Sequence, residues 1–493
     1  MAAIASLTLA RSRFGVSLPV LVALVAFATV LASGATLLGD PDTFWHIVAG
    51  RWIIAHHAVP RIDIFSNSVP GTPWVAHEWL AETVFAPLYD RFGWNGPVLA
   101  TALAFAASLA ILTRALLRWL EPVHALAFMA TSWAMALPHL LTRPHVLALP
   151  ILIFWFAALA QARSNARAPS LWLAPLMALW ANLHGGYVVG LVFAGLFAGE
   201  AVLLAPGRAA RLVALRRWAP FVGLSILAAL ATPHFLEGLY FPFQLIRMKF
   251  ALSVLVEWQS PNFQTIQPLE IWLMLALALT FGFGVRLPPT RIAMLLLLLH
   301  MSLAHQRHAE LLGLVAPLLV AEPIAELLRR RRAVAASALD ETFAALAGRA
   351  GVFGCVGVGL FAAALGLVFL AHPLLRKPDG YAPAAALDAA KAAHLRGPVF
   401  NDYDFGGYLI FSGVAPFIDG RADMYGDAFI KRYVEATRGI NDDLPKLLDD
   451  YHIAWTLLGA NTTAATLMAH RPGWSRLYAD DTAIIDVRDS AAP

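Results

Sequence analysis

The chain has 493 residues, of which 59% are hydrophobic and 14% are charged, and its mean hydropathy is +0.65. Soluble domains carry about 25% charged residues, so this composition excludes an ordinary cytosolic enzyme, and its hydrophobicity excludes a disordered chain. The net charge of +4 is too small to indicate nucleic acid as a partner. The composition is therefore typical of a membrane protein.

Apolar segments long enough to cross a hydrocarbon core of roughly 30 Å recur along the chain. They predict an α-helical polytopic membrane protein with about eleven transmembrane helices, at 17–38, 95–117, 121–138, 145–161, 169–184, 187–205, 218–233, 268–285, 292–306, 309–325 and 351–372. The first segment resembles a signal peptide, but its apolar stretch exceeds the roughly 7 to 15 residues of a signal core, so we expect a retained helix.

The orientation follows from Lys and Arg, which are enriched in short cytoplasmic loops. With the N-terminus in the cytoplasm, the inner side holds Arg11, Arg13, Arg114, Arg118, Arg163, Arg167, Arg208, Arg211, Arg216, Arg217, Arg286, Arg291, Arg329, Arg330, Arg331, Arg332 and Arg349. The short outer loops hold only Arg143, Arg247, Lys249 and Arg307. An odd number of spans then places the C-terminus on the outer side.

Two long segments face the outer side in this topology. We expect a membrane domain over 1–372, which includes a large outer loop at 39–94, and a small α/β domain over 373–493. Within that domain the pattern predicts helices near 382–395 and 426–450, and strands near 399–401, 417–419, 454–458, 476–479 and 483–488. No inner segment is large enough for a nucleotide-binding fold, and no glycine-rich phosphate loop is present, so an ATP-driven pump is not expected.

The first outer loop begins with acidic residues beside a proline. Asp40 suits a helix N-cap and Pro41 the first helical position. Asp42 is not needed as a second cap, and it would share a helix face with His46, where both groups could act on one substrate or bind one metal. Carboxylates at a membrane interface are costly unless they are used.

The same loop contains further candidate substrate-site residues. For Asp63 we favour a role in organising a turn over a role in binding substrate. His77 and Glu78 are adjacent and would diverge by about 100° on a helix, so we do not expect them to bind one ion together.

Later outer segments repeat one composition, in which His, Arg or Glu stands beside Pro or Gly at the end of a span. These residues are His139, Arg143, His145, His184, His234, Glu257, His305, Arg307 and His308. A single His at such a position is more often a hydrogen-bonding residue than a ligand, but five such clusters on one side suit an anionic phosphate or pyrophosphate headgroup. Zinc-protease and serine-hydrolase motifs are absent. We predict no cofactor; a divalent metal is compatible with these residues but is not predicted.

This arrangement resembles the GT-C superfamily of membrane glycosyltransferases, which includes dolichyl-phosphate-mannose protein mannosyltransferases and bacterial aminoarabinose transferases. The resemblance covers about 15–372 and rests on the architecture and on Asp40-Pro41-Asp42. The stretches 42–46, 60–66, 402–408 and 418–421 are also similar to those of bacterial members.

The resemblance implies an inverting transfer of a sugar from a polyprenyl-phosphate donor in the membrane lipid to an acceptor, at the outer face of a bacterial inner membrane. It implies that Asp42 deprotonates the acceptor hydroxyl while Asp40 assists or caps the helix. The candidate residues for the donor phosphate are Arg143, His184, His234 and Arg307. The chain lacks the Asp-Glu pair of the protein mannosyltransferases and the Trp-Trp-Asp motif of oligosaccharyltransferases, so protein N-glycosylation is not expected, and a glycan, lipid or protein acceptor stays open.

Polar residues of the tail have two interpretations. Asp402, Asp404, Asp419, Arg421 and Asp423 would either bind carbohydrate or hold the small domain together, and we favour the second interpretation. The glycines of Gly406-Gly407 and Gly420 suit a close backbone approach or a tight turn.

Three alternative functions remain open at this point. A transporter or flippase of lipid-linked sugars predicts polar residues in the cytoplasmic half of the spans, where the sequence has few. An O-antigen-ligase-like enzyme would use Arg and His without an essential carboxylate. A membrane scaffold would dock partners through its tail.

Overall fold

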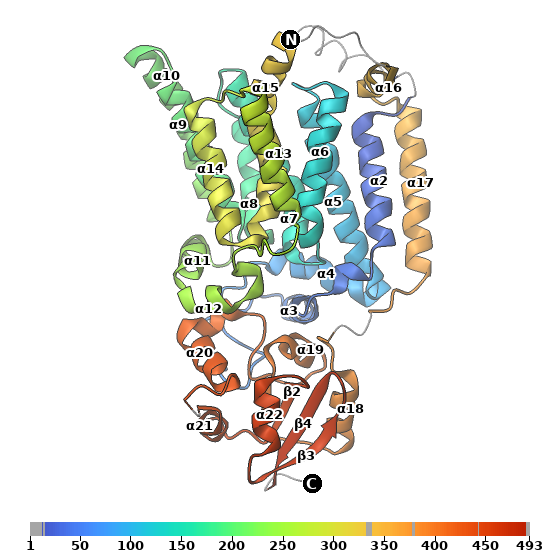
Figure 1. Ribbon diagram of the computed structural model, residues 1–493, viewed down its shortest axis with the longest axis vertical. Coiled ribbons are helices and arrows are strands. Elements are labelled where there is room, and N and C mark those ends of the chain that lie inside the picture. Colours follow the sequence, from blue (N-terminus) through green and yellow to red (C-terminus); the bar gives the residue numbers. More distant parts are fainter. Residues whose placement is uncertain (1–11, 13–14, 332–337, 377–379, 442, 490–493) are drawn as a thin grey trace. The chain divides into compact units, whose positions relative to one another are not determined.

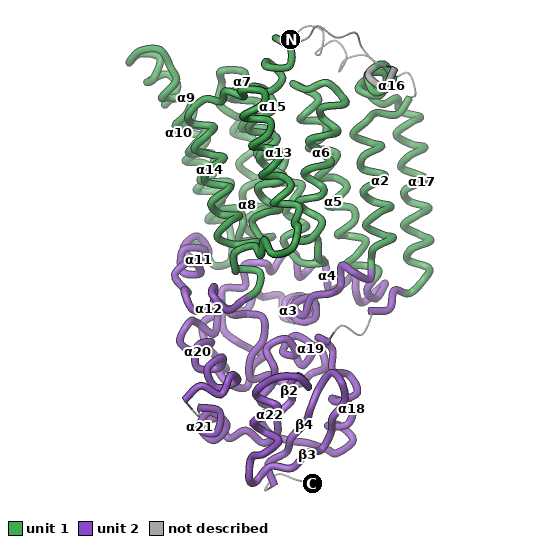
Figure 2. The backbone as a smooth tube through the Cα atoms, in the orientation of Figure 1, with its two compact units in different colours: residues 1–34, 95–235, 256–373 green, residues 35–94, 236–255, 374–493 purple. Residues whose placement is uncertain are grey.

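The computed structural model describes residue 12 and residues 15–331, 338–376, 380–441 and 443–489 (Figure 1). Arg11, Arg13 and Arg332 of the charge pattern lie outside the described residues. The chain divides into two compact units (Figure 2). Unit 1 comprises 1–34, 95–235 and 256–373, and unit 2 comprises 35–94, 236–255 and 374–493. The first outer loop thus belongs to the same unit as the tail, whereas the sequence-based division grouped that loop with the spans.

Unit 1 is helical, and a helix lies over each of the eleven predicted spans. These helices are α2 (Leu18–Ala32), α5 (Asn95–Leu116), α6 (Pro122–Ala136), α7 (Pro144–Ser164), α8 (Ala174–Leu183), α9 (Tyr187–Leu203), α10 (Gly207–Ala229), α13 (Pro268–Phe283), α14 (Pro289–Ala304), α15 (Ala309–Arg331) and α17 (Val352–Ala371), with α16 (Ala338–Ala347) between the last two. Of the described helices, five are long and apolar enough to cross a membrane, namely α5, α7, α10, α17 and the segment Gln306–Arg330 that contains α15. The chain is therefore a multi-pass membrane protein, while the count of eleven spans and the orientation stay predictions.

Helix starts and exposed faces in unit 1 follow from the sequence. Pro122, Pro144, Pro268 and Pro289 stand at the starts of α6, α7, α13 and α14, where a missing N–H costs no helical hydrogen bond. In α17 only Gly366 is buried, so its apolar side chains suit contact with lipid.

Unit 2 brings helices of the first loop together with later parts of the chain. The loop forms α3 (Asp42–His56) and α4 (Trp79–Phe92), and the segment before residue 256 forms α11 (Phe235–Arg247) and α12 (Lys249–Val254). Helices α3 and α4 lie close because residue 50 is glycine; a Cβ there would collide with the carbonyl group of Glu82. The start of α12 is bound to the tail, since Asp427 accepts the N–H groups of Phe250 and Ala251 at 3.1 and 2.7 Å.

The tail folds into the small α/β domain that was predicted. Its elements are α18 (Ala384–Ala392), β1 (Val399–Asn401), α19 (Gly406–Phe411), α20 (Ala422–Thr437), α21 (Asp443–Asp450), β2 (Trp455–Gly459), α22 (Thr463–Ala469), β3 (Trp474–Ala479) and β4 (Ala483–Arg488). The sheet has the order β1-β2-β4-β3. Strands β1 and β2 are parallel, and the other two pairs are antiparallel. Helices α19 and α22 were not predicted.

The predicted strand at 417–419 is wrong, because a side chain satisfies its backbone instead of a neighbouring strand. Asn401 Oδ1 accepts the N–H of Phe417 at 2.7 Å, and Asn401 Nδ2 donates to the carbonyl oxygen of Ile418 at 2.9 Å. The segment is buried, but it does not enter the ladder of the sheet.

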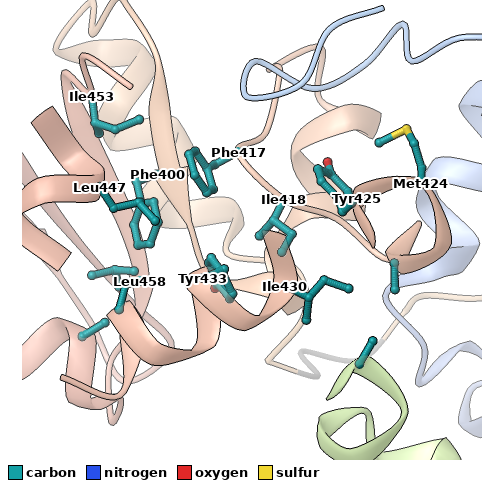
Figure 3. Packing of buried hydrophobic residues seen from close by; sticks show 14 of the residues in the cluster. Phe400, Phe417, Ile418, Met424, Tyr425, Ile430, Tyr433, Leu447, Ile453 and Leu458 are labelled. Atoms are coloured by element: carbon teal, nitrogen blue, oxygen red, sulfur yellow. The ribbon is translucent and has the colours of Figure 1, made fainter. Parts of the chain in front are cut away.

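One hydrophobic core spans the separate segments of unit 2. Trp45 and Trp74 of the first loop and Met248 next to α12 pack into the same cluster as tail residues such as Phe417. Figure 3 shows the part of this core in the tail, where Phe400, Phe417 and Tyr433 lie together. Burial of this aromatic surface holds the first loop to the tail.

Candidate functional site

Asp40 and Asp42 have different roles at the start of α3. Asp40 is 1% exposed, and its Oδ1 accepts the backbone N–H of Asp42 at 2.8 Å, so it caps the first N–H of α3, although the helix begins at Asp42 and not, as expected, at Pro41. Asp42 is only half-buried, and its Oδ1 accepts the indole N–H of Trp45 at 3.1 Å. The structure therefore leaves the second carboxylate outside the cap.

Two glycines of the tail lie against the start of α3. A Cβ on Gly420 would overlap the carboxylate of Asp42, and a Cβ on Gly407 would overlap the carbonyl oxygen of Pro41. Both glycines belong to the tail stretches that the sequence marked for close approach. Their missing side chains let the tail pack directly on the acidic start of the loop helix.

His46 is paired with a residue that the sequence reasoning did not select. Its Nδ1 lies 3.0 Å from Oε1 of Glu82, and its ring lies tilted against that of Trp45, with 3.7 Å between centroids. Burial lowers the pKa of His46 to about 3. Burial also raises the pKa of Glu82 to about 8, against the opposing effect of the Arg421 charge. At neutral pH both side chains are therefore uncharged, and a single hydrogen lies between Nδ1 of His46 and Oε1 of Glu82.

The other two loop candidates extend from this pair. Glu78 lies between the histidines, with Oε2 3.7 Å from His46 Nε2 and Oε1 3.8 Å from His77 Nε2. The ring of His77 stacks on Phe241. Exposure of the four side chains decreases from His77 and Glu78 to His46 and Glu82. These contacts bring three predicted residues and one missed residue into a single row.

Asp63 is part of a buried structural network. Its carboxylate accepts the N–H and the hydroxyl of Ser66, as the turn interpretation expects, and it lies 2.8 Å from Nη1 of Arg421. Arg421 binds Asp419 through Nε and Nη2 at 2.8 and 2.7 Å. Burial alone would lower the pKa of Arg421, but the Asp419 charge and hydrogen bonds raise it, so the guanidinium is firmly charged. These residues hold loop and tail together, which agrees with the interpretation favoured for the tail.

A second group of candidates meets in unit 1. Glu257 accepts one hydrogen bond from Arg143 at 2.7 Å and another from Arg307 at 2.9 Å. Burial alone would raise the pKa of Glu257, but the charges of Arg307 and Arg143 lower it to about 2. The three residues, called the cationic cluster below, carry two positive charges and one negative charge. Arg307 also lies over the ring of Trp258.

Histidines lie next to the cationic cluster. The rings of His145 and His184 are 6.0 Å apart, and His145 Nε2 is 3.7 Å from Oε2 of Glu310. His184 Nδ1 accepts the N–H of Gly186 at 3.0 Å, so its Nε2 carries the proton and is a donor.

Three other histidine candidates lie in unit 1. Burial and then the Arg307 charge lower the pKa of His139, which keeps that ring neutral. His308 contacts Trp258, and His234 is buried just before α11.

Two functional candidates were missed in the sequence. Glu82 lies one helical turn after Glu78 on α4, and this spacing is the signal that could have identified it. Glu310 lies two residues after His308, in the first turn of α15. Among the described residues, no three His, Cys, Asp or Glu side chains are arranged to hold a metal ion.

Comparison with known proteins gives a fold but no sequence family. No family model matches the chain, and no curated protein matches its sequence. The crystal structure of apo ArnT from Cupriavidus metallidurans is 14% identical over 97% of this chain and 98% of ArnT, with a TM-score of 0.51. ArnT bound to undecaprenyl phosphate is 16% identical over the same shares, with a TM-score of 0.39.

A third solved structure matches over a smaller share of both chains. The oligosaccharyltransferase AglB from Archaeoglobus fulgidus, in complex with an inhibitory peptide and a dolichol-phosphate, is 9% identical over 88% of this chain and 69% of AglB, with a TM-score of 0.47. ArnT and AglB are GT-C superfamily membrane glycosyltransferases. The likeness to apo ArnT over nearly the whole chain confirms, for the fold, the resemblance that was inferred from the sequence.

Proposed function

We propose that this protein is an integral membrane glycosyltransferase that moves a sugar from a polyprenyl-phosphate donor to an acceptor on the outer face of the bacterial inner membrane, with inversion. The fold shared with ArnT supports this proposal. ArnT itself binds undecaprenyl phosphate, a lipid carrier of the proposed class. The base and the phosphate-binding residues are assigned below separately, each within its own unit.

Asp42 is the proposed general base. It takes the proton of the acceptor hydroxyl while the acceptor oxygen bonds to the anomeric carbon and the bond from that carbon to the phosphate oxygen breaks. The observation that carries this assignment is the difference between the two acidic residues: Asp40 is buried in the cap, whereas Asp42 is half-buried and outside it. A positioned base of this kind contributes about 10²- to 10⁴-fold to the rate.

The cationic cluster is the proposed site for the donor phosphate. One positive charge of Arg143 and Arg307 is neutralised by Glu257, so a net charge of one remains for the phosphate. Glu257 engages one nitrogen of each guanidinium, and each guanidinium has five N–H donors in total. Charge-assisted hydrogen bonds to the phosphate would stabilise it as it leaves. The Nε2–H group of His184 is a further hydrogen-bond donor in unit 1. His234 is also proposed to bind the donor phosphate.

The decisive experiment measures the release of polyprenyl phosphate from a labelled polyprenyl-phosphate sugar by purified protein in bilayers. Asp42→Asn is expected to lower the rate by about 10²-fold or more. Asp90→Asn is the matched control, because Asp90 is exposed and pairs only with Arg51 among the described residues. Full activity of Asp42→Asn would overturn the assignment of the base and favour the O-antigen-ligase-like alternative, which uses no essential carboxylate.

The structure bears on one alternative function, that of a transporter, which requires polar residues along the cytoplasmic half of the spans. Glu200 is buried with Arg163 and Arg291 at the helix ends that the charge pattern places in the cytoplasm. These three residues lie within the terminal turns of α7, α9 and α14, so they do not continue a polar path along the helices. Movement of lipid-linked sugar across vesicles without release of polyprenyl phosphate would support the transporter. Absence of both activities with every donor would support the scaffold.

A further inference from the structure

A cavity with charged side chains in its lining lies among helix ends of unit 1, far from the cationic cluster. Its volume is about 200 Å³, and Arg163, Ser164, Glu200, Arg291 and Glu322 line it. Arg143 of the cationic cluster precedes α7, and Arg163 lies in its last turn, so roughly 30 Å of helix separates the two places. A cavity of this size holds several water molecules. The proposed glycosyl transfer does not use it.

One side of the cavity carries an excess positive charge. Glu200 is 3% exposed and receives Nε and Nη2 of Arg291 at 2.7 and 3.2 Å, together with the hydroxyl of Thr290 at 3.0 Å. Arg163 Nε is 2.9 Å from Glu200 Oε1, without the geometry of a hydrogen bond. Because one carboxylate faces two guanidiniums, a net positive charge remains, and it is located on Arg163, the more exposed of the two.

Another side of the cavity carries a negative charge. Glu322 Oε1 accepts the hydroxyl of Ser164 at 2.6 Å. Within the described part of the chain, Glu322 forms no ion pair. Arg163 and Glu322 therefore present opposite charges to the same cavity without being paired to each other. Glu322 is half-buried without a cationic partner among the described residues, and Arg163 shares the carboxylate of Glu200 with Arg291. A ligand that supplies the missing charges would relieve the cost of burying them.

We propose that this cavity binds the zwitterionic headgroup of an aminophospholipid, with its phosphate on Arg163 and its ammonium on Glu322. A simple anion would be repelled by Glu322, and a simple cation would be repelled by Arg163. An aminophospholipid headgroup has one charge of each sign, separated by a short linker, and its ammonium is a hydrogen-bond donor. Helix ends of membrane spans lie at the depth of the headgroups, where such a ligand is abundant.

Native mass spectrometry of the full-length protein with added lipids tests the proposal. The probes are phosphatidylethanolamine, phosphatidylglycerol and phosphatidylcholine with identical acyl chains. We expect preferential retention of phosphatidylethanolamine, because phosphatidylglycerol has no ammonium and the quaternary ammonium of phosphatidylcholine donates no hydrogen bond. Arg163→Gln is expected to weaken this retention roughly tenfold, and Glu322→Gln is expected to abolish the preference over phosphatidylglycerol.

Matched controls lie four residues further along the chain. Arg167→Gln and Glu326→Gln make the same changes of charge at exposed residues that do not line the cavity. Equal retention of the three lipids by the unmodified protein would overturn the proposal, and so would an equal loss in Glu322→Gln and Glu326→Gln. The lipid comparison on the unmodified protein needs no variant to fold. Binding of free phosphoethanolamine as tight as that of the lipid would overturn the assignment to a membrane lipid.

Discussion

The carboxylate of Asp42 occupies the space in which a side chain at position 420 would begin, so Gly420 of the tail is in direct contact with the proposed base on the first loop. The contact lies within unit 2, whose core is built from both segments. The tail is therefore part of the structure that positions Asp42, in addition to being a small folded domain.

Gly420→Ala is expected to displace the Asp42 carboxylate and to lower kcat by about 10²-fold, since a small misplacement of a catalytic group has an effect of this size. The measurement is the release of polyprenyl phosphate, with thermal unfolding recorded in parallel. Gly199→Ala is the control, because a Cβ there meets no atom within 4 Å. An unchanged kcat in Gly420→Ala would contradict the positioning role of the tail.

Arg143→Gln and Arg307→Gln are each expected to lower kcat/KM for the donor by about 10²-fold, because each removes a charge-assisted donor from the proposed phosphate site. Steady-state kinetics with varied donor concentration provide the measurement. Arg208→Gln, at an exposed residue of α10, is the control for loss of one positive charge in unit 1. Equal effects of all three substitutions would point to net charge alone and would argue against a phosphate site.

The pair of Glu82 and His46 predicts a dependence of stability on pH. The folded pKa of Glu82, about 8, lies above its ordinary value of 4.5, so its contribution is complete below pH 4.5 and is lost as the pH rises to 8. The folded pKa of His46, about 3, lies below its ordinary value of 6.5, so its contribution is lost as the pH falls from 6.5 to 3. The two effects oppose each other between pH 4.5 and 6.5, and only that of Glu82 changes the stability between pH 6.5 and 8.

Between pH 6.5 and 8 the unmodified protein is therefore expected to lose about 1 to 2 kcal/mol of unfolding free energy, and Glu82→Gln is expected to lose much less. Thermal unfolding at several pH values measures the difference. Glu326→Gln is the control, because Glu326 is exposed. A steeper loss in Glu82→Gln than in the unmodified protein would contradict a protonated Glu82.

Arg421→Ala is expected to destabilise unit 2 by about 3 to 5 kcal/mol, since it leaves the buried carboxylates of Asp63 and Asp419 without their cation. Limited proteolysis and thermal unfolding follow this loss. Arg432→Ala removes an exposed ion pair with Asp450 and is expected to cost less than about 1 kcal/mol. Similar stability of the two variants would show that Arg421 is not the link between loop and tail.

The sequence by itself determined the elements whose signals are local. Apolar segments located the helices of unit 1, because burial in lipid or protein requires such runs. Asp40 followed by Pro41 marked the start of α3, since capping depends on neighbouring residues only. Strand signals also located the four strands of the tail that the structure contains.

Only the tertiary structure decided which distant residues meet. Asn401 satisfies the backbone at Phe417, so a segment with strand composition forms no strand. Glu82 rather than Asp42 binds His46, and Gly420 rather than a side chain faces Asp42. Such pairings depend on how helices and segments pack, and no periodicity along the chain encodes a contact between residues far apart in sequence. The apolar composition thus specified a membrane protein, whereas packing in unit 2 set the surroundings of its proposed base.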